Sequence, residues 1–166
     1  MTQQQLLAQL QQWQQRAAQH HIRLPVVWQG DKDSLLAQIA TLLQLTQPEQ
    51  VYWLGADAPP AATDLSAKTA YQLLGTECDT LVINAFNGFN ADLVAASAGC
   101  VKAGGLWLLL CPPFELWQQQ PNPAHKHLLP YPLDASTHQG QFVSSWLTLL
   151  QQQNIFLLRD QQLLRH

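Results

Sequence analysis

The residues best placed to do chemistry lie in one polar turn, NAFNGFNAD at residues 84–92. The turn follows an apolar run typical of a buried strand, and ligands of open α/β sheets bind at the carboxyl ends of strands. Amides and a carboxylate there could hydrogen-bond a polar ligand. The candidate ligand residues are Asn84, Asn87, Gly88, Asn90 and Asp92. We favour a structural interpretation, in which Asn and Gly shape the turn and Asn90 caps the next helix.

Glycine-rich phosphate loops are absent from the sequence. Neither G-x-x-x-x-G-K-[ST] nor G-x-G-x-x-G occurs, although such glycines let backbone amides approach phosphate. The two candidate turns, WQGDKDS and WLGADAPP, each hold one glycine and at least one acid, which would repel phosphate. G-x-S-x-G, the nucleophile turn of many hydrolases, is also missing. We therefore expect no cofactor and no catalytic residue in this chain.

Histidine and cysteine give no sign of a metal site. His125 and His127 form an H-x-H, but no acid or cysteine lies beside them at ligand spacing. The three cysteines, Cys78, Cys100 and Cys111, match no C-x-x-C pattern. We predict no bound metal and interpret the cysteines as buried structural thiols in a reducing cytoplasm.

Composition limits the classes of partner. Of the 166 residues 47% are hydrophobic and 11% charged, and the net charge is -3. The eight Lys and Arg are scattered, so no patch that would follow a phosphate backbone is visible. The N-terminus does not resemble a secretory signal, and no apolar run is long enough to cross a membrane. We expect a cytoplasmic protein with no membrane contact.

Around the polar turn, segments with helical spacing of apolar residues alternate along the chain with short apolar runs typical of strands. Helical spacing of apolar residues predicts helices at 3–20, from Asp31 or Asp33 through the forties, at 66–75, after Asn90, and at 141–153. Apolar runs predict strands at 23–30, 50–55, 79–86, 105–111 and 154–160. Strands this apolar have both faces covered. We predict one α/β domain over residues 1–166, a Rossmann-like or flavodoxin-like three-layer sandwich around a mainly parallel five-stranded sheet.

A long proline-rich loop interrupts this pattern at residues 112–140. Six of the ten prolines lie there, and we expect at most a short helical turn within it. Loops of this length usually carry function or contact a partner. Phe114, Trp117 and Tyr131 are candidate interface residues, although they could instead pin the loop to the core.

The order of these features resembles a known family. The run YQLLGTECDTLVINAFNGFNADLVAASAGCVKAGGLWLLLCPPFELWQQQPNP, followed by YPLDASTHQGQFVSSWLTLL, is similar to the N-terminal domain of bacterial tRNA(Met) cytidine acetyltransferase. The shared pattern is a Leu-Leu-Gly, a strand ending at a turn with Gly-Phe, a Gly-rich turn into an aliphatic strand with prolines, a tryptophan and a later aromatic helix. It spans about residues 23 to 160. Asn84 departs from the acidic residue that the family often has there.

The resemblance implies a part of a larger enzyme. That enzyme acetylates the wobble cytidine of elongator tRNA(Met), using acetyl-CoA and hydrolysis of ATP or GTP. Its N-terminal domain precedes a helicase-like ATPase domain, an acetyltransferase domain and a tRNA-binding tail. The implied role of this chain is a non-catalytic scaffold or interaction module that packs against the ATPase domain, with tRNA(Met) as a further partner. Two alternatives remain: a standalone Rossmann-like protein that binds a small molecule, and an enzyme similar to S-adenosylmethionine-dependent methyltransferases.

Overall fold

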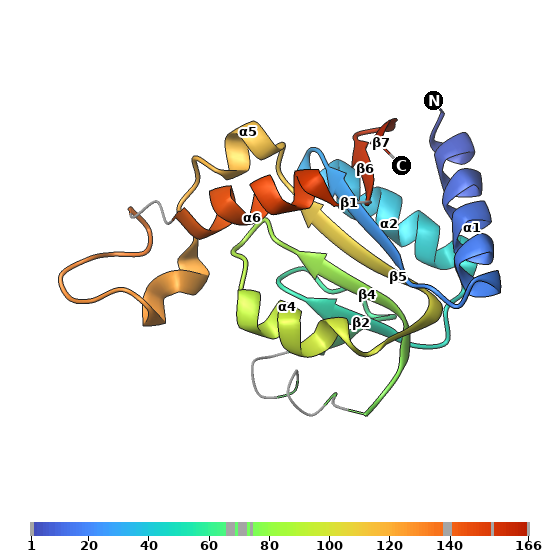
Figure 1. Ribbon diagram of the computed structural model, residues 1–166, viewed down its shortest axis with the longest axis horizontal. Helices are drawn as coiled ribbons and strands as arrows, with labels where there is room; N and C mark the ends of the chain where they lie inside the picture. Colours follow the sequence, from blue (N-terminus) through green and yellow to red (C-terminus); the bar gives the residue numbers. More distant parts are fainter. Residues whose placement is uncertain are drawn as a thin grey trace.

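The fold is built around one sheet of seven strands (Figure 1). The computed structural model describes residues 2–65, 69, 73, 75–137, 141–153 and 155–165. The strand order is β3-β2-β4-β5-β1-β6-β7, and every neighbouring pair is parallel except β6 and β7. The strands are β1 (Leu24–Gln29), β2 (Val51–Leu54), β3 (Thr63–Leu65), β4 (Cys78–Asn84), β5 (Val101–Cys111), β6 (Phe156–Arg159) and β7 (Gln162–Arg165). The predicted α/β class and mainly parallel sheet are confirmed.

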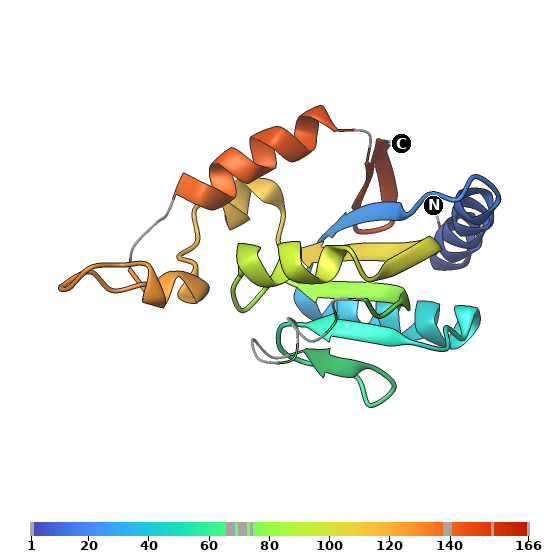
Figure 2. The same cartoon turned by 60° about the horizontal axis from the view of Figure 1, so that its bottom comes forward.

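Helices cover both faces of the sheet, as Figure 2 shows with α2 behind the strands and α4 in front. The helical elements are α1 (Gln3–Gln19), α2 (Lys32–Thr46), α4 (Ala91–Ala98), the short α5 (Phe114–Trp117), the 3-10 helix η2 (Pro123–His127) and α6 (Gln141–Gln152). Side chains cap four of these N-termini: Thr2 caps α1, Asp31 caps α2, Asn90 caps α4 and Asn122 caps η2. Each cap satisfies backbone N–H groups that a helix start leaves unpaired.

Two separate cores explain why the central strands are so apolar. On one face α1 and α2 contribute Leu10 and Ile39, which pack against Trp28 and Leu108. On the other face α6 and the proline-rich segment bury Leu147 and other side chains against the opposite sides of the same strands. Fully burying one such aliphatic or aromatic side chain stabilises the fold by about 1.5–3 kcal/mol.

The sheet has two more strands than the five predicted. β3 is a short edge strand whose Thr63 and Asp64 are exposed, so it lacks the apolar signal of a strand. β7 lies antiparallel to β6 after a tight turn in which Asp160 has φ 51°. Most of the predicted helix at 66–75 falls outside the described residues. The proline-rich loop holds two short helical turns, α5 and η2, where we expected one at most. In the described part of the chain, no helix is long and apolar enough to span a membrane.

Candidate functional site at the carboxyl edge of the sheet

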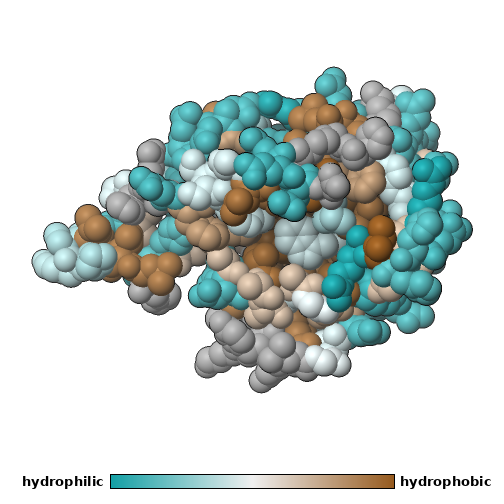
Figure 3. All heavy atoms as spheres, viewed as in Figure 1, coloured by the Kyte–Doolittle hydropathy of each residue, from teal (hydrophilic) through white to brown (hydrophobic). Residues whose placement is uncertain are grey.

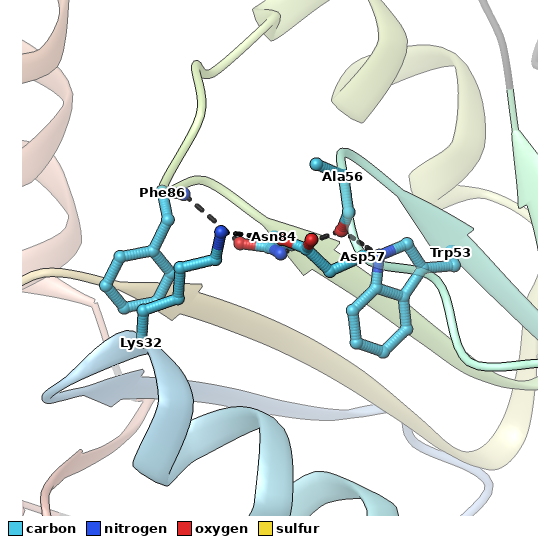
Figure 4. A network of polar contacts seen from close by, with 6 residues as sticks. All are labelled: Lys32, Trp53, Ala56, Asp57, Asn84 and Phe86. Carbon is cyan, nitrogen blue, oxygen red and sulfur yellow. Dashed lines mark hydrogen bonds and ion pairs between the residues drawn. The ribbon is translucent and has the colours of Figure 1, made fainter.

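The turn after β4 begins with Asn84, whose side chain is buried and bonded on both sides. Its Nδ2 donates to the Ala56 carbonyl oxygen at 2.8 Å, and its Oδ1 accepts from the Phe86 N–H at 3.2 Å (Figure 4). The amide therefore ties the loop after β2 to the turn after β4. Both polar atoms of Asn84 have partners within the protein, so its amide is already engaged where a ligand would approach.

The same loop after β2 is held by further polar contacts that Figure 4 shows. Trp53 Nε1 donates to the Ala56 carbonyl oxygen at 2.9 Å, and Lys32 Nζ lies 2.8 Å from Asp57 Oδ2. Gly55, with φ 103°, makes the close approach possible, because a Cβ there would lie 2.3 Å from the Asn84 carbonyl oxygen. The network joins the ends of β2 and β4 to the start of α2.

The rest of the turn leads into α4. Gly88 has φ 129°, and Asn90 Oδ1 accepts from the Asp92 and Leu93 N–H groups at 3.1 and 3.2 Å. Asp92 is exposed in the first turn of α4, where its negative charge interacts favourably with the helix dipole. Asn87 is exposed, and within the described residues its side chain makes no hydrogen bond. Among the described candidate amides, Asn87 therefore has both polar atoms available to a ligand, whereas Asn90 has only its Nδ2.

Asn122, which the sequence analysis missed, holds the turn from its other side. It is 5% exposed and makes four hydrogen bonds. Its Oδ1 accepts from the N–H groups of Phe89 and Ala124, while its Nδ2 donates to the Phe89 carbonyl oxygen at 2.7 Å and contacts His125 Nε2 at 3.0 Å. This one side chain thus pairs with both the N–H and the carbonyl oxygen of Phe89, as a neighbouring strand would, and fixes the proline-rich segment to the turn.

The turn opens onto a small cavity of about 330 Å³. This volume is close to the lower end of the range for small-molecule sites, about 300–1,000 Å³. Most of its wall is apolar, and Asn87 and Asn90 are its polar side chains besides Asn84. The lining residues include no cation. The cavity offers hydrogen-bonding amides but no positive charge to balance a phosphate.

A second cavity, of about 480 Å³, lies where the strand order reverses. The connection that follows β1 leads to one side of the sheet and the one that follows β5 leads to the other, and open α/β sheets bind ligands at such a switch point. No motif in the sequence pointed to this place. Lys32 is paired with Asp57, and Arg159 is paired with Glu115. Because Asp31 and Asp160 also line this cavity, it has no surplus of positive charge.

The candidate interface residues separate into buried and exposed ones. Phe114 and Trp117 are 8% and 4% exposed and belong to the core on the α6 face. Trp117 packs edge-on against Phe89 and Trp146, with ring centroids 5.6 and 6.1 Å apart. Tyr131, in contrast, is 98% exposed. Of these three rings, only that of Tyr131 is exposed to solvent and accessible to a partner.

Apart from Glu115 and Asp134, whose pKa values are lowered first by backbone N–H donors, the perturbed titratable groups of the described residues lie at the opposite, amino edge of the sheet or in the core. Burial opposes ionisation of Asp79, but hydrogen bonds from Lys102 and the Gln50 N–H lower its pKa overall. The Cys78 thiol lies 3.4 Å from the Cys100 sulfur, and this contact together with burial raises the pKa of Cys78. Burial raises the pKa of Cys111. Neutral buried thiols are poor nucleophiles, so Cys78 and Cys111 are not suited to nucleophilic catalysis.

Comparison with known proteins identifies the family. A family model described as tRNA(Met) cytidine acetyltransferase TmcA, N-terminal, matches residues 1–161. Proteins named tRNA(Met) cytidine acetyltransferase TmcA from Nitrosococcus halophilus and Salmonella typhimurium are 30% and 33% identical over 84% and 68% of this chain. The chain spans only 19% and 16% of the length of these relatives. It belongs to the family of N-terminal domains of tRNA(Met) cytidine acetyltransferase TmcA.

Proposed function

We propose that this chain is the accessory N-terminal domain of an ATP-dependent tRNA(Met) cytidine acetyltransferase and is itself non-catalytic. The observation that carries the proposal is the family match over residues 1–161. The parent enzyme would transfer the acetyl group of acetyl-CoA to the exocyclic amine of the wobble cytidine. This domain would supply a rigid scaffold and a contact surface.

The polar groups at the carboxyl edge support an accessory role. Acetyl transfer to an amine needs a base to take its proton and donors that stabilise the developing oxyanion. The buried amides here, Asn84 and Asn122, donate to carbonyl oxygens of the protein itself. The cations of the switch-point cavity, Lys32 and Arg159, are paired with carboxylates. These groups are committed to the fold, so we assign acetyl-CoA and ATP or GTP to other domains.

The proposed partners follow from the same assignment. The helicase-like ATPase domain of the same protein is the primary one, because the matched region is only 19% and 16% of the length of the two relatives. Contact with tRNA(Met) is secondary, since the net charge of -3 and the scattered basic residues do not favour a polyanion. Acting on tRNA would place the protein in the cytoplasm.

Isothermal titration calorimetry of this chain tests the non-catalytic assignment. We expect no heat of binding with acetyl-CoA, ATP or GTP at ligand concentrations up to about 1 mM, an affinity limit near -4 kcal/mol. Micromolar binding of any of the three would contradict the assignment.

A standalone protein that binds a small molecule is the second candidate function. The observation in its favour is the cavity of about 480 Å³ at the switch point of the sheet. Micromolar binding of S-adenosylmethionine in the same titration series would support its methyltransferase-like form. Asn87, which lines both carboxyl-edge cavities, would then be the first residue to substitute.

A further inference from the structure

Residues 123–137 form an arm that projects from the body of the domain (Figures 1 and 2). Three large apolar side chains on it face solvent: Leu128 is 73% exposed, Tyr131 98% and Leu133 50%. Figure 3 shows apolar side chains on this projection at the left of the molecule. Single exposed leucines are ordinary, but three such residues gathered on a projecting segment of a monomer mark a contact surface.

The arm is firmly attached at its base. Asn122 precedes it and makes its four hydrogen bonds to Phe89, Ala124 and His125, while the buried Trp117 anchors the chain just before. Prolines 123, 130 and 132 restrict the backbone of the arm itself. A surface that is already positioned loses less conformational entropy when it binds.

A recess beside the arm extends the apolar surface. Its volume is about 360 Å³, and Leu128, Phe89 and Phe142 line it together with His125. Phe142, at the start of α6, is itself 39% exposed, and its ring lies 6.1 Å from that of His125. The arm and the start of α6 therefore form one concave apolar face, the shape that accepts a side chain from a partner.

The charge of the arm distinguishes between classes of partner. Its residues include one lysine, Lys126, and one aspartate, Asp134. Binding of RNA requires several Lys or Arg that neutralise phosphates, and the strength of binding grows with their number. An arm with balanced charge and exposed apolar side chains suits a protein surface instead.

We propose that the arm, with the recess at Phe142, docks onto an apolar surface of the polypeptide that accompanies this domain in the full-length enzyme. The inference rests on the proposed function. The chain spans 19% of its Nitrosococcus halophilus relative and 16% of its Salmonella typhimurium relative, so more than four-fifths of each relative lies outside the region matched. A covalently joined partner is present at an effective concentration of the order of millimolar, so a small apolar surface suffices to hold it.

Site-specific photo-cross-linking in the full-length enzyme tests the docking. The photoreactive residue p-benzoylphenylalanine replaces Tyr131 in one preparation and Leu45 in a matched control. Leu45 is 56% exposed on α2, away from the arm. We expect illumination to join position 131, but not position 45, to a peptide outside residues 1–166. Cross-links from position 131 that stay within residues 1–166, or that reach tRNA or a second copy, would overturn the proposal.

Two further measurements distinguish a failure of this inference from a failure of the proposed function. The wild-type enzyme is assayed for acetylation of tRNA(Met): activity without the cross-link overturns docking alone, whereas the cross-link without activity overturns the function alone. The double variant Leu128→Ala with Tyr131→Ala then shows whether the contact holds the domain in place. We expect trypsin to cleave the full-length variant at the arm about ten times faster, and this 166-residue chain to keep its melting temperature. An unchanged cleavage rate would contradict docking.

Discussion

Replacing Asn122 with alanine tests whether one buried amide holds the proline-rich segment to the turn after β4. The substitution removes all four hydrogen bonds of the side chain. Two of them serve the N–H and the carbonyl oxygen of Phe89, at 2.9 and 2.7 Å, and no other partner of these two backbone groups is described. Leaving a buried polar group unpaired costs about 1–3 kcal/mol. Two such groups give an expected loss of about 2–4 kcal/mol, since partial entry of water offsets part of the penalty.

Urea unfolding of this chain, followed by tryptophan fluorescence, measures the loss. With a slope of about 2 kcal/mol per molar urea, the midpoint should fall by about 1–2 M. Asn87→Ala is the matched control, because Asn87 is exposed in the same turn and its side chain has no described hydrogen bond. We expect that control to stay within about 0.5 kcal/mol of the wild type. If Asn122→Ala unfolds at the same urea concentration as Asn87→Ala, the amide does not hold the segment.

Three more predictions follow from the site and the core. In the same urea titration, Gly55→Ala should lower the free energy of unfolding by more than about 2 kcal/mol, because φ at Gly55 is 103° and the new methyl would lie 2.3 Å from the Asn84 carbonyl oxygen. The control Gly99→Ala should be nearly neutral, because open space surrounds that position. Trp117→Ala should lower the free energy of unfolding by about 3–5 kcal/mol in a thermal unfolding experiment, because the ring is buried. Equally small effects of Trp117→Ala and of Tyr131→Ala, whose ring is exposed, would contradict this packing. The pKa of Asp79 is lowered in the folded state, so its carboxylate stabilises the fold above the ordinary value of 3.8, and this stability is lost as the pH falls through the lower folded value. The wild type should therefore lose more free energy of unfolding than Asp79→Asn between pH 7 and pH 2. Parallel losses in the two proteins would show that the carboxylate contributes nothing.

The sequence predicted most of the fold because its central strands are continuous apolar runs. β1, β4 and β5 were found for that reason, and their burial on both faces indicated a parallel sheet. β3 was missed since its stability comes from pairing with β2 and not from apolar residues of its own. β7 was missed because its pairing with β6 depends on the turn at Asp160, which has no glycine to signal it.

The site was predicted less well because its geometry depends on residues far apart in the chain. The turn residues were identifiable by type, yet the partner of Asn84 is 28 residues away and that of Asn122 is 33 away. Asn122 precedes Pro123, a dipeptide that signals a turn but not its partner. The cavity between β1 and β5 follows from strand order, which no local pattern encodes. The sequence likewise did not show which aromatic candidates are buried: Phe114 lies in the core, whereas Tyr131 is exposed to solvent.

We propose that this domain is part of a tRNA acetyltransferase but does not itself perform the reaction. Transfer of radiolabelled acetyl groups from acetyl-CoA to tRNA(Met), in the presence of ATP, tests it most directly when this 166-residue chain and the full-length enzyme are assayed side by side. We expect incorporation by the full-length enzyme and none above background by this chain. Acetylation of tRNA by this chain alone would contradict it.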